Sequence, residues 1–355
     1  MSWETELYVV RLKMPEDKRY SKSLKLEDIE KHLERGATGK SYESYIKPGI
    51  LYFTGDLNTL AKELGVDRIV SKGLYIMGIY GGGKEEEEKY AGLVLLEHSI
   101  DDFTFKFKLY NTRDLLVVPI ESLDKYGIKV YKMIYVGEIN PFRINKYLDI
   151  ILSEQGKDSL KRFLEEAIKL NERDISVETR DKVRKLVNEL QQPAEVKPLD
   201  TDKYYVIYRC DRVFTASACK PVDNTIVYSN TAYVECRDES VAYYYAAVLN
   251  YLAYTVVSTG RAFVRHQYAR PLLATYIAGL SWNSVDAITR KKIVALSRKL
   301  HEKSPSREYA DQKVALKKIA RLRKFKEIVE TLNSKVDRES LEEALNVVSG
   351  KGVKK

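Results

Sequence analysis

Cysteine, histidine and long apolar runs are scarce in this sequence of 355 residues. The three cysteines, Cys210, Cys219 and Cys236, form no CxxC pair, and the four histidines do not supply the rest of a zinc site. We therefore expect reduced, mostly buried thiols, no metal and no cofactor. The longest apolar run, 241–257, contains several tyrosines and Asn250, which predicts a core helix rather than a membrane span.

Glutamine is also scarce, whereas lysine, glutamate and tyrosine are abundant, a composition typical of proteins from hot environments. Apolar residues make up 44% of the chain, which is enough for a folded core. Lysine and arginine number 60 against 51 acidic residues, so the formal net charge is +9. This balance favours a polyanionic partner.

The pattern of apolar residues predicts an α+β protein of two domains. In the first, residues 1–190, strands between about 70 and 140 are expected to form a mostly antiparallel sheet or a small barrel. A polar stretch with two prolines, 191–200, is the expected linker. Helical periodicity in the first domain is found at 23–36, 57–65, 144–170 and 176–192.

The second domain, 201–355, begins with strands and ends with basic helices. Asp238 is expected to cap the apolar helix 239–258, and a long basic helical region begins near Thr289. The expected strands are 203–210, 212–222, 224–229 and 231–237.

Two short motifs resemble catalytic loops but depart from them. "GIYGGGKE" (78–85) has the spacing of a phosphate loop, but Glu85 stands where a hydroxyl should bind magnesium, so we interpret it as a hairpin tip. "INPFR" (139–143) resembles the Asn-Pro-Pro-aromatic corner of amino-methyltransferases, but it lacks the second proline. We expect a helix to start there, with Pro141 in its first turn.

An acidic pair in the second domain leaves an enzymatic alternative open. Asp223, followed by a strand that carries Glu235 and Arg237, is the arrangement with which many magnesium nucleases hold their metal. Arginine is a poor substitute for the usual lysine, because it does not lose its proton. A magnesium-dependent nuclease that uses Asp223 and Glu235 is therefore the second interpretation.

Cations are concentrated after the apolar helix. "STGRAFVRHQYARP" (258–271) carries three arginines and a histidine, and residues 289–326 contain fourteen lysines and arginines against three acids. Apolar stripes at Ile293, Leu296 and Leu300 and at Val314, Leu316, Ile319 and Leu322 predict two helices whose opposite faces are cationic. Such faces bind a phosphate backbone. Twelve of the 26 tyrosines lie in 201–276, where a few could stack on bases.

Residues 203–303 resemble the target-recognition region of type II-like adenine-N6 DNA methyltransferases. The shared order is "YYVIYR", "RVFTASAC", the strand pair and helix of "VDNTIVYSNTAYVECRDESVAYYYAAVLN", the loop "TGRAFVRHQYARPLLA" and the helix "TRKKIVALSRKLHEK". That family's catalytic domain is missing from residues 1–200, so the resemblance implies DNA binding without methyl transfer. It places Arg261, Arg265, His266 and Arg270 on the DNA side.

We therefore expect a non-catalytic double-stranded DNA-binding protein, either a specificity module or a chromatin-associated factor, in the cytoplasm and on the nucleoid. An adaptor that recruits another DNA enzyme is a further alternative. A protein partner or a second copy of the chain stays open, and no membrane partner is expected. The expected DNA contacts, on one continuous surface, are Arg261, Arg265, His266, Arg270, Lys291, Lys292, Arg298, Lys317, Arg321, Arg323 and Lys324.

Overall fold

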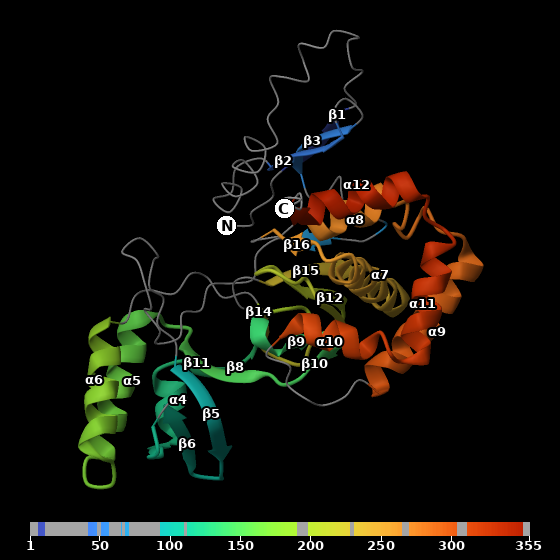
Figure 1. Ribbon diagram of the computed structural model, residues 1–355. Coiled ribbons are helices and arrows are strands. Elements are labelled where there is room, and N and C mark those ends of the chain that lie inside the picture. The colour runs from blue at the N-terminus through green and yellow to red at the C-terminus, as the bar shows by residue number, and fades with distance from the viewer. Residues whose placement is uncertain are drawn as a thin grey trace.

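The computed structural model in Figure 1 describes residues 6–10, 42–47, 51–56, 65, 68–70, 93–109, 112–189, 198–227, 231–264, 270–303 and 311–350. The protein is α+β, as the sequence predicts. No helix among the described residues is long and apolar enough to span a bilayer. The expected helix 23–36, the motif 78–85, most of the linker 191–200, and both Arg265 and His266 lie outside the described residues.

The first lobe, called the N-lobe, is a six-stranded sheet of order β14-β8-β11-β5-β6-β7. Neighbouring strands are antiparallel except β14 and β8, which run parallel. The expected antiparallel sheet is confirmed, in an open rather than a closed form. The strands are β5 (Leu93–Ile100), β6 (Thr104–Leu109), β7 (Leu116–Pro119), β8 (Ile128–Ile134), β11 (Leu148–Ser153) and β14 (Thr225–Val227).

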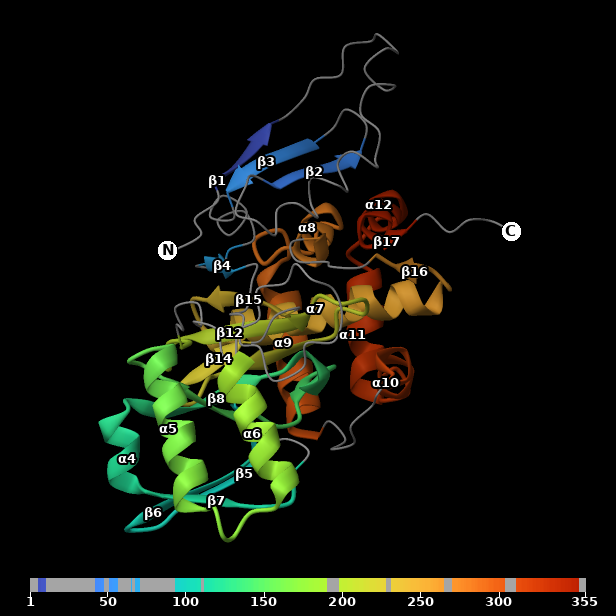
Figure 2. The same ribbon diagram turned by 90° about the vertical axis from the view of Figure 1, so that its left-hand side faces the viewer.

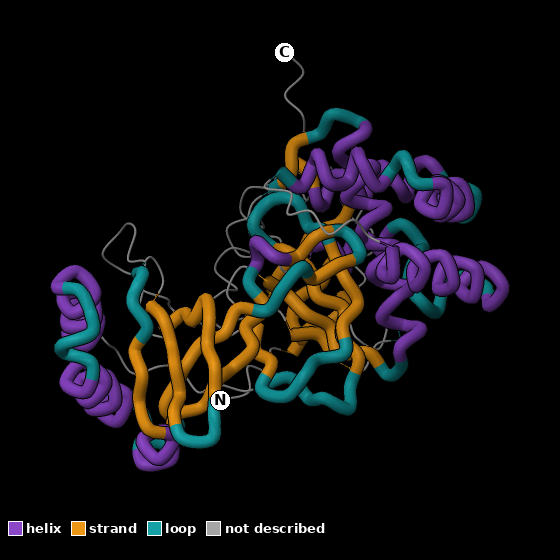
Figure 3. Tube along the Cα trace, turned by 90° about the horizontal axis from the view of Figure 1, so that it is seen from below, coloured by secondary structure: helices purple, strands orange, loops and turns teal. Residues whose placement is uncertain are grey.

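Three helices cover one face of this sheet: α4 (Ile120–Lys125), α5 (Lys157–Leu170) and α6 (Val177–Glu189). Figure 3 shows them on the side that faces away from the rest of the molecule. Alternation along β6 points Phe105 and Phe107 at the helices, and Phe107 stacks on Phe163 of α5 at 5.6 Å between ring centroids. This apolar layer is the core of the N-lobe.

The second lobe, called the C-lobe, is a four-stranded sheet of order β13-β12-β15-β4, all antiparallel, with α7 (Glu239–Ser258) on one face. The side chain of Asp238 accepts a hydrogen bond from the amide of Val241, so the expected cap is confirmed. Buried side chains occur on all sides of α7, because other helices enclose it (Figure 2). The strands are β4 (Arg68–Val70), β12 (Tyr204–Arg209), β13 (Ala216–Cys219) and β15 (Thr231–Cys236).

The helices around α7 are α8 (Arg270–Ile277), α9 (Ala287–Lys303), α10 (Gln312–Ile319), α11 (Arg323–Asn333) and α12 (Arg338–Val348). Ile293, Leu296 and Leu300 of α9 are buried, as their spacing predicts. Two further small sheets are present among the described residues. β1 (Glu6–Val10), β3 (Leu51–Asp56) and β2 (Tyr42–Lys47) form one with three strands, and β16 (Ala262–Phe263) pairs with β17 (Ser349–Gly350).

Strands from each expected domain enter the sheet of the other. β4 comes from the first domain and pairs with β15, while β14 comes from the second and pairs with β8. A small apolar cluster, which includes Ile134 and Tyr205, joins the two sheets. The expected boundary at 191–200 therefore does not separate the two sheets, because each sheet contains one strand from the other side of it.

The expected helix at 144–170 is wrong in its first thirteen residues, 144–156. Residues 148–153 form β11, and the helix α5 begins at Lys157. β11 lies between β8 and β5, where it is paired on both edges and buried at Ile150 and Ile151. A short apolar run buried on both faces has the same composition in a strand and in a helix, so sheet pairing decides its structure.

The expected helix start at 139–143 is also wrong. β9 (Ile139–Asn140) and β10 (Arg143–Ile144) form a hairpin whose two-residue turn is Pro141 and Phe142. Phe142 has a φ of 62°, in the left-handed region of backbone conformation, which is unfavourable for a bulky side chain such as phenylalanine. Its amide donates to the carbonyl of Ala216 at 2.9 Å and its ring is fully buried, so tertiary contacts hold it there.

Candidate nucleic-acid interface

The two arginines of the segment 258–271 that the structure describes, Arg261 and Arg270, are held within the fold of the protein. The guanidinium of Arg261, three residues after the end of α7, forms an ion pair with Glu342 of α12 and donates to Oδ1 of Asn346 at 3.1 Å. Arg270 is the first residue of α8 and is 6% exposed, so its side chain is not at the surface. These two residues therefore have structural roles in the described fold.

Helix α9 presents cations of two kinds. Lys291 and Lys292 are exposed on its outer face. Arg298 instead lies over the ring of Tyr243 at 5.4 Å, and its Nη2 is 2.8 Å from Oε2 of Glu239. A carboxylate at that distance compensates the charge of Arg298. The exposed cations of this helix are Lys291, Lys292, Lys299 and Lys303.

The expected cations lie in separate groups. Arg298 contacts Glu239 at the start of α7, whereas Arg261 follows its end, and a helix of 20 residues is about 30 Å long. Figure 2 shows α8 and α12 on one side of α7 and α10 on the other. The structure does not bring Arg261 and Arg298 onto one loop or one helix face.

Many cations lie at the junction of α10 and α11, residues 313–326, which we call the basic corner. This segment has seven lysines and arginines and no acidic residue. Six are exposed, and Lys324 is half-buried. Arg323 forms an ion pair with Glu327 at 2.9 Å and is 93% exposed in its side chain. The seven cations are Lys313, Lys317, Lys318, Arg321, Arg323, Lys324 and Lys326.

A break between two helices produces this corner. α10 ends at Ile319, and Leu322 takes an extended conformation (φ −72°, ψ 130°) before α11 begins. Leu316, Ile319 and Phe325 are buried beneath it, so the helical period turns the cations outward. Val314 and Leu322, which the apolar spacing placed in the core, are 40% and 38% exposed. Leu322 lies at the break itself.

Sequence reasoning selected Lys317, Arg321, Arg323 and Lys324 from this corner and omitted Lys313, Lys318 and Lys326. The signal for the omitted three was present. No carboxylate separates Asp311 from Glu327, so that interval of the sequence carries charges of one sign only.

The two carboxylates of the nuclease alternative lie on elements of different lobes. Asp223 is exposed in the turn before β14 in the N-lobe sheet, whereas Glu235 lies on β15 in the C-lobe sheet. Glu235 is 3.5 Å from the ammonium of Lys203. Within the described ranges, no three histidine, cysteine or acidic side chains cluster as a metal would require.

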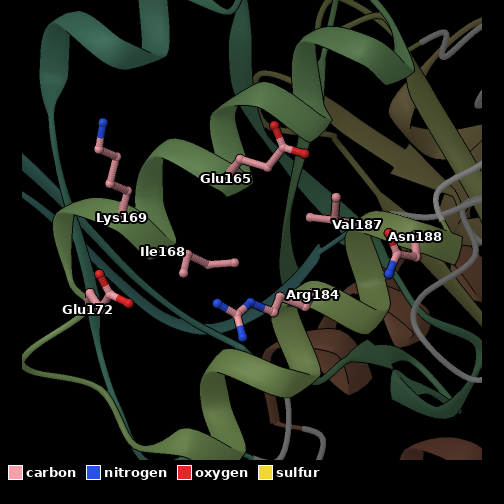
Figure 4. Close-up of a pocket in the computed structure, with 7 residues that line it drawn as sticks. All are labelled: Glu165, Ile168, Lys169, Glu172, Arg184, Val187 and Asn188. Atoms are coloured by element: carbon pink, nitrogen blue, oxygen red, sulfur yellow. The ribbon is translucent and has the colours of Figure 1, made fainter.

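Two surface hollows occur in the N-lobe. One, of about 480 Å³, lies between α5 and α6, where Arg184 extends across the gap toward Ile168 (Figure 4). Its lining carries Glu165 and Glu172 beside Lys169 and Arg184, a balanced set that does not favour an anion. The other, of about 490 Å³, follows β7 and is lined mainly by apolar side chains.

No protein-family model matches this chain. A comparison with curated proteins finds no match either. The functional argument therefore depends on the residues themselves.

Proposed function

We propose that this protein binds double-stranded DNA without catalysis and that the basic corner is its main contact with phosphate. The observation that carries the proposal is the charge of residues 313–326, with seven cations and no carboxylate over two helices. A solvated helical face usually mixes both signs of charge, whereas a single sign attracts a polyanion and releases its counterions.

The start of α11 supports the same proposal. Leu322 provides no side-chain cap, and the first turn contains Arg323 and Lys324 but no acidic residue. The amino end of a helix carries partial positive charge, so cations there are unfavourable within the isolated protein. An incoming phosphate removes this conflict because it accepts from the free amides and neutralises the cations.

The resemblance of residues 203–303 to a methyltransferase target-recognition region extends the proposal. This stretch forms three strands of the C-lobe sheet together with α7, α8 and α9. Arg265 and His266, between α7 and α8, are proposed as base or phosphate contacts in addition to the corner. A specificity module separated from its methyltransferase is the role that these features fit.

The test is duplex affinity as a function of salt concentration. Each cation on a phosphate contributes about 0.9 to the slope of log affinity against log salt. The triple variant Lys317→Ala, Arg321→Ala, Lys326→Ala is therefore expected to lower that slope by about 3. A matched control removes three exposed cations from the N-lobe: Arg162→Ala, Arg184→Ala, Lys185→Ala.

The control makes the result specific to the corner, because both variants lose the same charge. The control is expected to keep the slope of the unmodified protein within about 1. Equal losses in the two variants would show that net charge alone drives binding. A slope that stays unchanged in the corner variant, or no duplex binding at low salt, would refute the proposal.

A further inference from the structure

Leu322 lies at the break in the basic corner, after α10 has ended and before α11 begins. Its side chain is 38% exposed, and its two neighbours in the chain, Arg321 and Arg323, are exposed as well. Arg323 forms an ion pair with Glu327, one turn further along α11, but its side chain stays 93% exposed. The break therefore presents one apolar side chain between two guanidinium groups.

The backbone at Leu322 is fixed from both sides. Its amide donates to the carbonyl of Ile319 at 2.9 Å, and its carbonyl accepts from the amides of Phe325 and Lys326 at 3.0 and 3.1 Å. Ile319 and Phe325, three positions before and after it, are buried in the core of the C-lobe. A side chain on such a fixed backbone loses less entropy when it enters a binding partner.

Leucine is an unfavourable residue at this position. The residue that precedes a helix is best a serine, threonine, aspartate or asparagine, whose side chain accepts from a free amide of the first turn. Asp311 and Asp337 cap α10 and α12 in this way, whereas Leu322 makes no such bond to α11. Residues that break a local rule of this kind concentrate at functional sites.

We propose that Leu322 is a wedge that enters the minor groove of bound duplex DNA, between two neighbouring base pairs, and kinks the duplex there. This wedge rests on the proposed function and names the form of DNA that the basic corner binds. Proteins that bend DNA through the minor groove insert leucine or another apolar side chain between base steps and use arginine and lysine beside it. Arg321 and Arg323 contact the phosphates on the two sides of the opened step.

Unstacking two base pairs is costly, and the chemistry of the corner offsets this cost. Contact with the base faces removes the leucine side chain from water, and the bend brings further phosphates toward the cations on both sides of the break. The exposed lysines there are Lys313, Lys317 and Lys318 on α10 and Lys326 on α11. Pyrimidine–purine steps such as TA are the most easily kinked, so we expect the protein to prefer duplexes that contain one.

Val314 is the matched control for Leu322. It is 40% exposed and belongs to the same corner, so the two side chains differ little in exposure. It lies inside α10, however, where its neighbours in the chain continue the helix, and its side chain is one carbon shorter than that of leucine. Insertion is therefore expected of Leu322 and not of Val314.

Energy transfer between dyes at the two ends of a short duplex measures the kink. The duplex carries a single central TA step, and the unmodified protein is expected to bring its ends together through a kink of about 20–90°. The variant Leu322→Ser is expected to lose this kink, while its slope of log affinity against log salt stays within about 1 of the unmodified value. Leu322→Met retains an apolar side chain and is expected to retain the kink.

A fluorescent base at the TA step shows where the side chain enters. 2-Aminopurine in place of the adenine brightens when it is unstacked, and this increase is expected with the unmodified protein and with Val314→Ser but not with Leu322→Ser. Replacing the TA step by an AA step is expected to weaken binding of the unmodified protein and to leave the affinity of Leu322→Ser unchanged.

The serine variant also separates insertion from folding. Serine supplies the cap that α11 lacks, so Leu322→Ser is expected to be at least as stable as the unmodified protein in urea. A duplex that stays straight on the unmodified protein, or a kink that survives in Leu322→Ser, would overturn the wedge and leave the proposed function standing. Equal loss of the kink in Val314→Ser would also overturn it. Absent duplex binding by the unmodified protein would refute the proposed function and the wedge together.

Discussion

The side chain of Asn250 hydrogen bonds both backbone groups of Ala216. Its Oδ1 accepts from the Ala216 amide at 3.0 Å, and its Nδ2 donates to the Ala216 carbonyl at 2.8 Å. Asn250 belongs to α7 and Ala216 to β13, an edge strand of the C-lobe sheet. Asn171, the residue that follows α5, makes the same pair of bonds with Val117 of β7, so a side-chain amide completes one edge of each sheet.

Replacing Asn250 with leucine is expected to destabilise the protein by about 2 to 3 kcal/mol, because a buried amide hydrogen loses its partner. Asn250 is fully buried, so water cannot replace the amide without a cavity. Urea unfolding measures the loss. Substitution of the exposed Asn188 by leucine is the control and is expected to change the free energy of unfolding by less than about 0.5 kcal/mol. An Asn250→Leu variant as stable as the unmodified protein would show that the two hydrogen bonds contribute little to the free energy of unfolding.

Phe142 connects the N-terminal half of the chain to the C-lobe core and has a positive φ. Its ring packs edge-on against His301 and Phe325, at 5.4 and 5.8 Å between centroids. Phe142→Ala is expected to cost about 4 kcal/mol through loss of the buried ring. Phe142→Gly loses the same ring but relieves the left-handed backbone, so it is expected to be about 1 kcal/mol more stable than the alanine variant.

Unfolding in urea compares the two variants directly. In a conformation with negative φ, glycine would be the less stable of the pair. An alanine variant at least as stable as the glycine variant would therefore contradict strain at this position.

Local sequence signals predicted the elements whose structure is locally determined. The cap at Asp238, the buried helix that follows it and the stripe at Ile293, Leu296 and Leu300 depend on residues a few positions apart, and all are confirmed. In each case the helical period or a cap residue specifies the structure without reference to distant parts of the chain.

Features that depend on distant partners were missed. β11 is a strand because β8 and β5 flank it, and Phe142 adopts its turn because Ala216 accepts from its amide. In the candidate site, the density of cations was visible in the sequence, but the partners of Arg261 and Arg298 were not. Those carboxylates lie 81 and 59 positions away, beyond the reach of any local pattern.

The three thiols are expected to be unreactive in the folded protein. Cys210, Cys219 and Cys236 are at most 7% exposed. Burial raises the pKa of the Cys219 thiol to about 11 and raises that of Cys210 well above its usual value, which lowers the fraction of nucleophilic thiolate. Thiol titration is expected to count none in native buffer and three in denaturant. Rapid reaction of one thiol in native buffer would show that its part of the core opens.

His301 is expected to make stability depend on pH. Its Nε2 accepts from the amide of Ala218 at 2.9 Å, which leaves the proton on Nδ1, 2.9 Å from the carbonyl of Ser297. Burial lowers the pKa of His301 to about 4 from its usual 6.5. The folded state therefore favours the neutral ring, and the unfolded state takes up the proton first as the pH falls. The stability that the neutral ring contributes is complete above pH 6.5 and is lost progressively between pH 6.5 and 4.

The full loss is about 3 kcal/mol, from a pKa difference of this size. Urea unfolding of the unmodified protein and of His301→Gln across that range measures it, because glutamine can accept from Ala218 but does not titrate. The difference in free energy of unfolding between the two proteins is expected to shift in favour of the variant as the pH falls. A difference that stays constant from pH 6.5 to pH 4 would mean that His301 is protonated equally in both states, and the hydrogen bond from Ala218 would then not hold a neutral ring.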